Sequence, residues 1–178
     1  LRDGAGDPLP HADLYLLQDT NNNNPPAHNT DANGRFTLTA TPGTYRLRVY
    51  HGGGKHTTVS LTTAAFTLDA DRTDDLTLPT HTVQVRVVGP SGNPVPGTKL
   101  RLSSYPVATG ALAPGLTIAD AGYHWGNATT DANGKATLQL LTTPTDPSRT
   151  TVDVEAPTGT GLANTTLDAT NTTGPRTI

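Results

Sequence analysis

The sequence predicts an all-β chain of two tandem antiparallel β-sandwiches, and three observations lead to this prediction. Residues 30–36, Thr-Asp-Ala-Asn-Gly-Arg-Phe, return one hundred residues later as Thr-Asp-Ala-Asn-Gly-Lys-Ala at 130–136. Stretches that alternate between apolar and polar residues recur along the chain, separated by Gly, Pro, Asn and Asp. Threonine makes up about a fifth of the 178 residues and glutamate occurs only at Glu155, a composition that favours strands and turns over helices.

The repeat divides the chain into two units. A second pair of landmarks, Gly-Asp-Pro-Leu-Pro at 6–10 and Gly-Asn-Pro-Val-Pro at 92–96, is separated by 86 residues rather than 100. The second copy therefore holds 14 more residues between its landmarks than the first. We expect one sandwich over 1–79 and a second over 80–178, which carries an inserted loop at about 103–129.

Individual strands follow from alternation of period two. Residues 45–50 and 82–87 place apolar side chains at every second position, with arginine or glutamine between them. Residues 36–38 and 136–140 follow the two Asn-Gly pairs and are expected to be strands that leave hairpin turns. Both residues of such a pair tolerate positive φ, so type I′ turns are predicted.

The opening strand differs between the units. The second unit has a full strand, 82–88, before its first turn, whereas only Leu1 and Arg2 precede the corresponding turn of the first unit. Its first strand is therefore expected to be truncated or missing. Either upstream residues of a longer native chain complete it, or a neighbouring subunit supplies a strand by exchange. In the second case the tail 165–178 is the candidate exchange partner.

Composition and charge exclude several classes of function. Twelve Lys and Arg against fifteen Asp and Glu give a net charge of −3, so the chain lacks the basic field that binds nucleic acid. No apolar run is long enough for membrane insertion, and no cysteine is present. With no catalytic constellation in the sequence, we expect a protein that is not an enzyme, located outside the cell, at a cell surface or on a virion surface.

Three segments of the first unit, 6–12, 30–36 and 41–49, follow one another in a recognisable order. They are similar to the G-x-PLPGA, TDANGRF and PGTYxLxV signatures, so the unit resembles the carboxypeptidase regulatory-like (transthyretin-like, prealbumin-like) family. The resemblance implies an Ig-like sandwich of seven strands, typically non-catalytic and attached to enzymes, adhesins, surface layers or virion proteins.

The chain is similar also to collagen-adhesin B-type repeats, and this resemblance implies a bond between lysine and Asn or Asp side chains in some members. Lys99 alternates out of phase with Leu100 and Leu102. We therefore expect Lys99 to face solvent and no such bond to form.

Aromatic residues gather in the extra length of the second unit. Gly122 and Gly126 flank the only tryptophan, and the candidate ligand or partner site consists of Tyr105, Tyr123, His124 and Trp125. Aromatic side chains give contact area at low entropic cost, which suits stacking on carbohydrate or anchoring a partner. The alternative is that Trp125 closes the end of the sandwich.

Two further kinds of site are weaker candidates. An acidic cluster near the unit boundary could gather a calcium ion, or it could be a solvated turn; it comprises Asp69, Asp71, Asp74 and Asp75. No other cofactor is expected. Three Asn-x-Thr triplets are glycosylation acceptors in a host that glycosylates them; they begin at Asn127, Asn164 and Asn171.

The sequence thus predicts a non-catalytic structural or adhesive module of an extracellular or surface-exposed protein. Its partners would be other copies of itself or other domains of a larger surface protein. One alternative is a subunit that assembles into a filament, or into a phage tail or capsid surface, by strand exchange. A second alternative is a carbohydrate-binding accessory domain of a secreted hydrolase.

Overall fold

The computed structural model describes residues 1–18, 25–53, 56–104, 110–141, 151–168 and 175–178, and all regular structure in them is β. None of these residues forms a helix that could span a membrane. The strands are β1 (Asp13–Gln18), β2 (His28–Asn29), β3 (Gly43–Gly53), β4 (His56–Thr63), β5 (Phe66–Leu68), β6 (Thr80–Arg86), β7 (Lys99–Ser104), β8 (Ala111–Ala113), β9 (Leu116–Thr129), β10 (Lys135–Leu141), β11 (Thr151–Glu155), β12 (Thr165–Asp168) and β13 (Arg176–Thr177).

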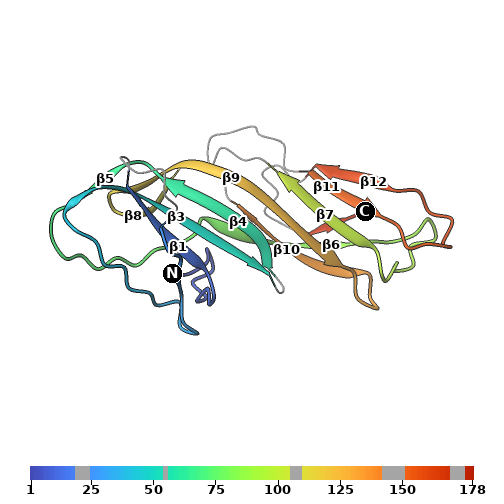
Figure 1. Ribbon diagram of the computed structural model, residues 1–178. Helices are drawn as coiled ribbons and strands as arrows, with labels where there is room; N and C mark the ends of the chain where they lie inside the picture. The colour runs from blue at the N-terminus through green and yellow to red at the C-terminus, as the bar shows by residue number, and fades with distance from the viewer. Residues whose placement is uncertain (19–24, 54–55, 105–109, 142–150, 169–174) are drawn as a thin grey trace.

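Two sheets contain these strands (Figure 1). The larger sheet has ten strands in the order β12-β11-β7-β9-β4-β3-β1-β2, with β5 paired to β3 and β8 paired to β9. The smaller sheet has the order β10-β6-β13. Every pairing between named strands is antiparallel except the parallel pair of β13 and β6, so the predicted antiparallel all-β fold is confirmed.

Strand β9 joins the two halves of the large sheet. Its residues from Ile118 to Trp125 pair with β4, and those from His124 to Thr129 pair with β7. The prediction of an inserted loop at about 103–129 is therefore wrong for most of that range, which holds the end of β7, β8 and the 14 residues of β9. Gly and Pro in this range favour a loop locally, but pairing to β4 on one side extends the chain into a strand.

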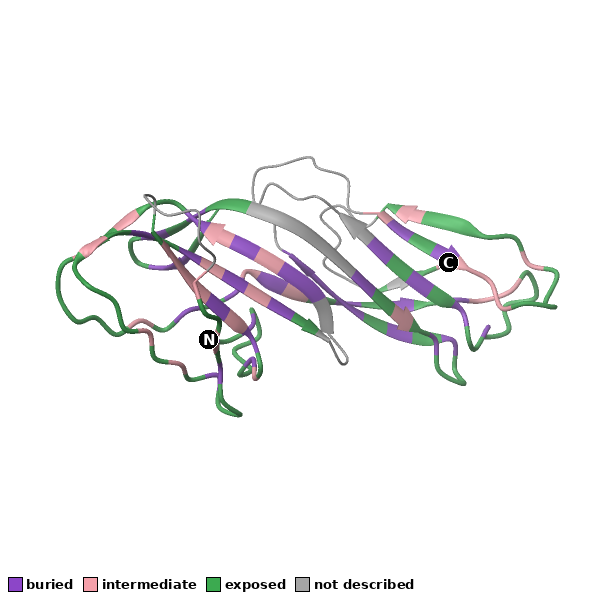
Figure 2. Cartoon of the chain, in the orientation of Figure 1, coloured by how far each residue is buried: buried purple, intermediate pink, exposed green. Residues whose placement is uncertain are grey.

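Two hydrophobic cores lie along the molecule, and buried positions alternate with more exposed ones along strands such as β3, β6 and β7 (Figure 2). The first core combines residues of the first unit, such as Leu14, Val49 and Leu61, with Leu112, Ile118 and other residues from beyond residue 110. The second core is built from β6, β7, β10 and β11. The division at residue 79 stays a prediction, and the first core draws part of its side chains from the second half of the chain.

Alternation correctly predicted which faces are buried. Tyr45, Leu47 and Val49 of β3 are buried, as are Val83 and Val85 of β6. Lys99 is exposed beside buried Leu100 and Leu102, as expected. Apolar side chains that share one face of a strand bury together, because successive residues point to opposite faces.

Both Thr-Asp-Ala-Asn-Gly turns have the same geometry, which differs from the predicted type I′ turn. Only the glycines, Gly34 and Gly134, have positive φ, at 73° and 69°. In the first turn the Asp31 carboxylate accepts hydrogen bonds from the amides of Asn33 and Arg35, both at 2.8 Å. The Asp131 carboxylate accepts the same bonds in the second turn. An aspartate that binds backbone amides favours this longer turn over a two-residue hairpin loop.

The two landmarks of each unit bind each other. The Thr30 hydroxyl donates to the carbonyl of Leu9 at 2.6 Å and accepts from the amide of Ala12 at 2.8 Å. In the second unit the Thr130 hydroxyl donates to Val95 and accepts from Thr98 in the same way. These threonines are buried, so the bonds satisfy backbone groups that water cannot reach.

The segment 36–38, predicted as a strand, belongs to no strand ladder. Its counterpart β10 pairs with β6 over seven residues, from Lys135↔Arg86 to Leu141↔Thr80. The prediction of a strand at 136–140 is confirmed. The prediction of a strand at 36–38 is wrong, because no described strand takes the place beside it that β6 takes beside β10. The ends of the chain lie within the fold: Arg2 bridges to Thr77, and β13 pairs with β6.

Candidate functional site

The predicted aromatic segment lies within β9. In the backbone register Tyr123 stands opposite Ser60, and Trp125 stands between Thr58 of β4 and Ser103 of β7. His124 is paired with Val59 and Ser104. Tyr105 lies outside the described residues. Three of the four predicted residues are thus consecutive positions of a sheet strand rather than parts of a loop.

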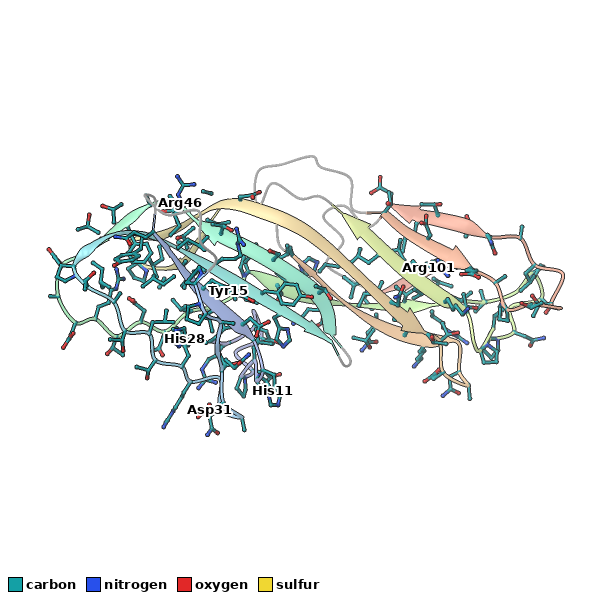
Figure 3. The ribbon with its side chains drawn as sticks, viewed as in Figure 1. His11, Tyr15, His28, Asp31, Arg46 and Arg101 are labelled. Carbon is teal, nitrogen blue, oxygen red and sulfur yellow. The ribbon has the colours of Figure 1, made fainter. Side chains whose placement is uncertain are left out.

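The same sheet carries an aromatic and cationic surface that the sequence analysis missed. Leu14 of β1 and Val49 of β3 are fully buried and stand opposite each other. Because successive residues of a strand point to opposite faces, the residues next to Leu14 in β1 and next to Val49 in β3 face outward. We define the outer face as the half-buried Tyr15 and Leu17 of β1 and the half-buried Arg48 and Tyr50 of β3. Tyr15 lies on β1, and Arg46 lies at the start of β3 (Figure 3).

The register sets the spacing on the outer face. Tyr15 pairs with Arg48, and Tyr50 pairs with Asp13 on one side and Ser60 on the other. Tyr15 and Tyr50 are therefore diagonal neighbours, whose Cβ atoms are about 7 Å apart in such sheets. Tyr123 pairs with Ser60, which pairs with Tyr50, so the backbone register places one predicted residue in the same row as a tyrosine that was not predicted. The sequence did contain a signal for this face, because Tyr15 lies between Leu14 and Leu16 and Tyr50 follows Val49, so both tyrosines are out of phase with the apolar residues.

This face combines groups that recognise flat or anionic partners. Phenol rings and arginine stems give apolar contact, while hydroxyl and guanidinium groups donate hydrogen bonds. The Asp13 carboxylate accepts a hydrogen bond from the Asn29 amide at the margin of the face, which ties β2 to β1. These groups lie side by side on one face of the paired strands β1 and β3.

The aspartates proposed for calcium do not converge. Asp74 forms an ion pair with the Arg72 guanidinium at 2.5 Å, and Arg72 also stacks over Phe66 and donates to the carbonyl of Pro114. In the part of the chain that the structure describes, which includes all four aspartates (Asp69, Asp71, Asp74 and Asp75), no three Asp, Glu or His side chains could hold one metal ion. The arginine inserted within the acidic run takes the carboxylate that a cation would need, so the structure does not support this site.

The three predicted glycosylation acceptors differ in their surroundings. Asn127 is exposed on β9, opposite Arg101. Asn164 is exposed, and its side-chain oxygen accepts a hydrogen bond from the amide of Ala156 at 2.9 Å. Asn171 lies outside the described residues. Acceptor function at all three positions stays a prediction.

A buried polar contact joins the two units. Asp3 accepts hydrogen bonds from the amides of Ala5 and Asp7, and its other carboxylate oxygen accepts one from Gln139 of β10 at 3.2 Å. Gln139 also donates to the Thr80 hydroxyl, which accepts a bond from the amide of Gly4. We call Asp3, Gly4, Thr80 and Gln139 the junction. No sequence motif marked it, because its members are far apart in the chain.

The comparisons with known proteins agree with the landmarks. Residues 1–79 match the family described as carboxypeptidase regulatory-like domain. No curated protein sequence matches the chain.

Among solved structures, the chain is similar to a candidate adhesin from Bacteroides ovatus ATCC 8483, with 11% identity, a TM-score of 0.43, and coverage of 99% of this chain and 86% of the adhesin. It is similar to the shaft pilin SpaA from Lactobacillus rhamnosus GG, with 15% identity, a TM-score of 0.38, and coverage of 94% of this chain and 86% of the pilin. The TIE protein of Bacillus anthracis gives 11% identity, a TM-score of 0.33, and coverage of 99% and 31%. At these scores the likenesses leave the function open.

The three landmark segments, the repeated turn geometry and the family match therefore agree: residues 1–79 match the carboxypeptidase regulatory-like domain family, and the rest of the chain repeats two of their landmarks.

Proposed function

We propose that this protein is a stiff, non-catalytic spacer within an extracellular or cell-surface protein, holding neighbouring domains apart at a fixed angle. The single observation that carries the proposal is β9, which pairs with β4 at one end and with β7 at the other. A linker between two sandwiches bends at its φ and ψ angles. The pairing of β9 with β4 overlaps its pairing with β7 at His124 and Trp125, so β9 cannot bend between the two halves without breaking ladder hydrogen bonds.

Packing supports the same role. Leu112, Leu116 and Ile118 enter the first core although they follow the strands β6 and β7 of the second core. Rotating one half against the other would expose these side chains, at a cost of about 1.5–3 kcal/mol for each fully buried leucine or isoleucine.

The junction, which includes Gln139 of the smaller sheet, also supports the spacer role. Gln139 of β10 contacts the carboxylate of Asp3, and both side chains are buried. A buried carboxylate that loses a hydrogen-bond donor is left with an unfavourable desolvated charge, so separation at this point is disfavoured. The two halves are therefore held together both by the large sheet and at the opposite layer.

A double spin-label measurement tests the spacer role. The chain contains no cysteine, so cysteines introduced at exposed Thr67 of β5 and exposed Thr166 of β12 would carry the only labels. We expect one narrow distance distribution by pulsed electron paramagnetic resonance. A broad or two-peaked distribution in the otherwise unchanged chain would show a hinge and overturn the proposal.

Two glycine substitutions provide a perturbation and its matched control. A Cβ at Gly4 would lie 1.8 Å from the carbonyl oxygen of Thr80, so Gly4→Ala wedges the junction apart. A Cβ at Gly89 would meet side-chain and backbone atoms only at 3.8 Å or more, within ordinary contact distance. The label distances should shift or broaden in Gly4→Ala and stay narrow in Gly89→Ala.

The outer face supports a second candidate function, in which the module also binds a partner or a carbohydrate. Tyr15 and Tyr50 are diagonal neighbours on an open sheet face, a spacing at which tyrosines present a joint stacking surface. Screening the protein against a glycan array, with Tyr15→Ala/Tyr50→Ala as the comparison, tests this candidate. Binding that survives in the double variant would remove the outer face from consideration.

Self-assembly by strand exchange remains an alternative prediction, although the tail proposed as the exchange partner pairs internally. β12 pairs with β11, and β13 pairs with β6. Light scattering over a wide concentration range distinguishes the two roles: a spacer keeps the mass of one chain, whereas an assembling subunit grows.

A further inference from the structure

The two Asn-Gly pairs of the repeated turns, Asn33-Gly34 and Asn133-Gly134, are chemically reactive as well as turn-forming. In a flexible chain the amide nitrogen of such a glycine attacks the side-chain carbon Cγ of the asparagine, because glycine has no Cβ to hinder the approach. A bond forms between this nitrogen and Cγ, and the side-chain nitrogen leaves as ammonia with the proton of the glycine N–H. Water then opens the cyclic succinimide to aspartate or to isoaspartate. Both pairs therefore carry the elements of a deamidation site.

The closed turns separate the reacting groups. Both asparagines are exposed to the water that the reaction consumes, whereas both glycines are buried. In the second turn the amide of Gly134 donates to the carbonyl of Asp131 at 2.9 Å, and in the first turn the amide of Gly34 donates to the carbonyl of Asp31 at 3.0 Å. The attacking nitrogen has to give up this hydrogen bond before it reaches Cγ.

The Asp131 carboxylate opposes the rotation that would bring the groups together. Its Oδ1 accepts hydrogen bonds from the amides of Asn133 at 2.8 Å and Lys135 at 2.9 Å, so the residues on both sides of Gly134 are fixed to one atom. The amide of Asp131 donates in turn to the carbonyl of Lys135 at 2.8 Å. Attack requires rotation about the bond between Cα and the carbonyl carbon of Asn133, so the reaction proceeds from the opened turn, whose population is set by the free energy of local opening.

Isoaspartate does not fit the closed turn. Its main chain runs through Cβ and Cγ and is longer by a methylene group. A Cβ at Gly134 would lie 2.4 Å from the carbonyl oxygen of Val87 and 3.1 Å from Pro94, so the backbone there has no room to shift. The carbonyl of Gly134 accepts a hydrogen bond from the amide of Val87 at 2.8 Å, and Lys135 begins β10 opposite Arg86. An added methylene displaces these contacts together.

We propose that Asn133 is a deamidation site that the closed turn keeps unreactive, and that its conversion to isoaspartate opens the turn and frees the start of β10. The change is irreversible because ammonia is lost, and water is its only co-reactant. Asn33 is the equivalent site of the first unit, since Asp31 accepts the corresponding amides there. This inference goes beyond the spacer role and does not depend on it, because it concerns the chemistry of the turns alone.

Comparison with a flexible peptide tests the protection. The probe is Thr-Thr-Asp-Ala-Asn-Gly-Lys-Ala-Thr, the sequence of residues 129–137, incubated beside the whole chain in neutral buffer. Peptide mapping by mass spectrometry follows the loss of asparagine in both samples. We expect Asn133 of the whole chain to be lost more slowly by about tenfold or more, since only the opened fraction reacts. Equal rates in chain and peptide would overturn the proposal.

The variant Asp131→Ala removes the carboxylate and keeps the Asn-Gly pair. The loss of Asn133 should become faster by about tenfold, while Asn33 in the other turn keeps its slow rate. Asn33 is an internal control in the same molecule, and Asp31→Ala should give the reverse pattern. An unchanged rate at Asn133 would overturn the role of the carboxylate. Equal acceleration at both sites would assign the protection to the global fold and would overturn the proposal as well.

A charge-matched variant tests the consequence of the modification. Chain aged in urea, where the turns are open, is fractionated, and the species with isoaspartate at residue 133 is refolded. Asn133→Asp carries the same added charge without the extra methylene. Amide hydrogen exchange at Lys135 and Ala136 should be faster in the isoaspartate chain by about tenfold or more. A failure of that chain to refold, where Asn133→Asp refolds from the same treatment, would support the proposal too. Equal protection in the two refolded chains would overturn it.

Discussion

The two units share their turns but differ in their strand partners. In each unit a buried threonine ties two landmarks together, and an aspartate and a positive-φ glycine close the following turn. After that turn the second unit forms β10 against β6, whereas residues 36–41 of the first unit form no backbone ladder within the part of the chain that the structure describes. Local motifs therefore fix local geometry, and whether the next segment becomes a strand depends on which partner lies beside it.

The units also differ in how they complete their cores. The second core is closed by strands that lie within residues 80–178, while the first core takes Leu112, Leu116 and Ile118 from beyond the second unit's own first strands. Residues from the part of the second copy that is longer than the first therefore pack into the first core. A tandem repeat need not fold as two separable domains.

The largest expected effect comes from the turn glycines, which should behave alike in both units. A Cβ at Gly34 would lie 2.2 Å from the carbonyl oxygen of Leu1, and one at Gly134 would lie 2.4 Å from that of Val87. With positive φ as well, Gly34→Ala and Gly134→Ala should each lower the free energy of unfolding by about 3–5 kcal/mol. Urea denaturation measures this loss.

Gly92→Ala is the control for the turn glycines. Gly92 also has positive φ, at 78°, but a Cβ there would meet no atom within 4 Å. Gly92→Ala should lower the free energy of unfolding by only about 1–2 kcal/mol, because only the backbone conformation is strained. If Gly134→Ala and Gly92→Ala lowered the free energy of unfolding equally, the overlap of a Cβ at residue 134 with the carbonyl of Val87 would not affect stability.

The second prediction concerns the segments that follow the turns. Leu138→Ala removes a fully buried side chain and should cost about 3 kcal/mol, whereas Leu38→Ala removes a half-buried one and should cost about 1 kcal/mol. Thermal or urea unfolding of the two variants gives the comparison. Equal losses would mean that the segment at 36–41 packs as completely in solution as β10 does, and the proposed contrast between the units would fail.

Most of the fold could be predicted because it depends on local patterns. Alternation located the buried faces of β3, β6 and β7, and the three landmark segments of the first unit pointed to the family whose model matches residues 1–79. The pairing of β9 with β4 could not be predicted, because it joins residues near 60 to residues near 120 and leaves no repeated motif in either.

The candidate sites were less predictable than the fold. The acidic cluster looked suitable for calcium by composition, but Arg72 within the same run binds Asp74. The outer face depends on two tyrosines from strands β1 and β3, and only the register places Tyr15 near Tyr50. A site on a sheet face is assembled across strands, so sequence proximity points to the wrong neighbours.

The third prediction exchanges two equivalent residues. His11 is the only described non-glycine residue with positive φ, at 58°, and Gly97 occupies the same place in the second unit with a φ of 76°. Both amides donate to the carbonyl of the landmark threonine, Thr30 or Thr130. Gly97→His should destabilise by about 1 kcal/mol, while His11→Gly should stabilise by about 0.5 kcal/mol, because glycine relieves the strain but adds chain entropy to the unfolded state.

Thermal unfolding measures both members of this exchange. A Cβ at Gly97 would contact only Pro157, at 3.8 Å, so steric overlap does not confuse the comparison. If His11→Gly instead lost stability, His11 would contribute contacts that outweigh its backbone strain, and the two positions would not be equivalent.

The smallest expected effect is a pH dependence shared by the two turns. Hydrogen bonds from the amides of Arg35 and Asn33 lower the pKa of Asp31 from its ordinary value of 3.8, and the amides of Lys135 and Asn133 act likewise on the pKa of Asp131. A carboxyl whose pKa is lower in the folded state stabilises the protein above its unfolded pKa, and this stability is lost as the pH falls through the folded pKa. Asp31→Asn and Asp131→Asn keep an acceptor oxygen but cannot titrate, so each should lower stability at neutral pH and flatten the decline below about pH 4.

Asp69→Asn, exposed and outside both turns, is the control. Urea midpoints from about pH 2 to pH 7 measure the effect, and a steep acid limb retained in the double variant Asp31→Asn/Asp131→Asn would assign the acid sensitivity to other carboxylates.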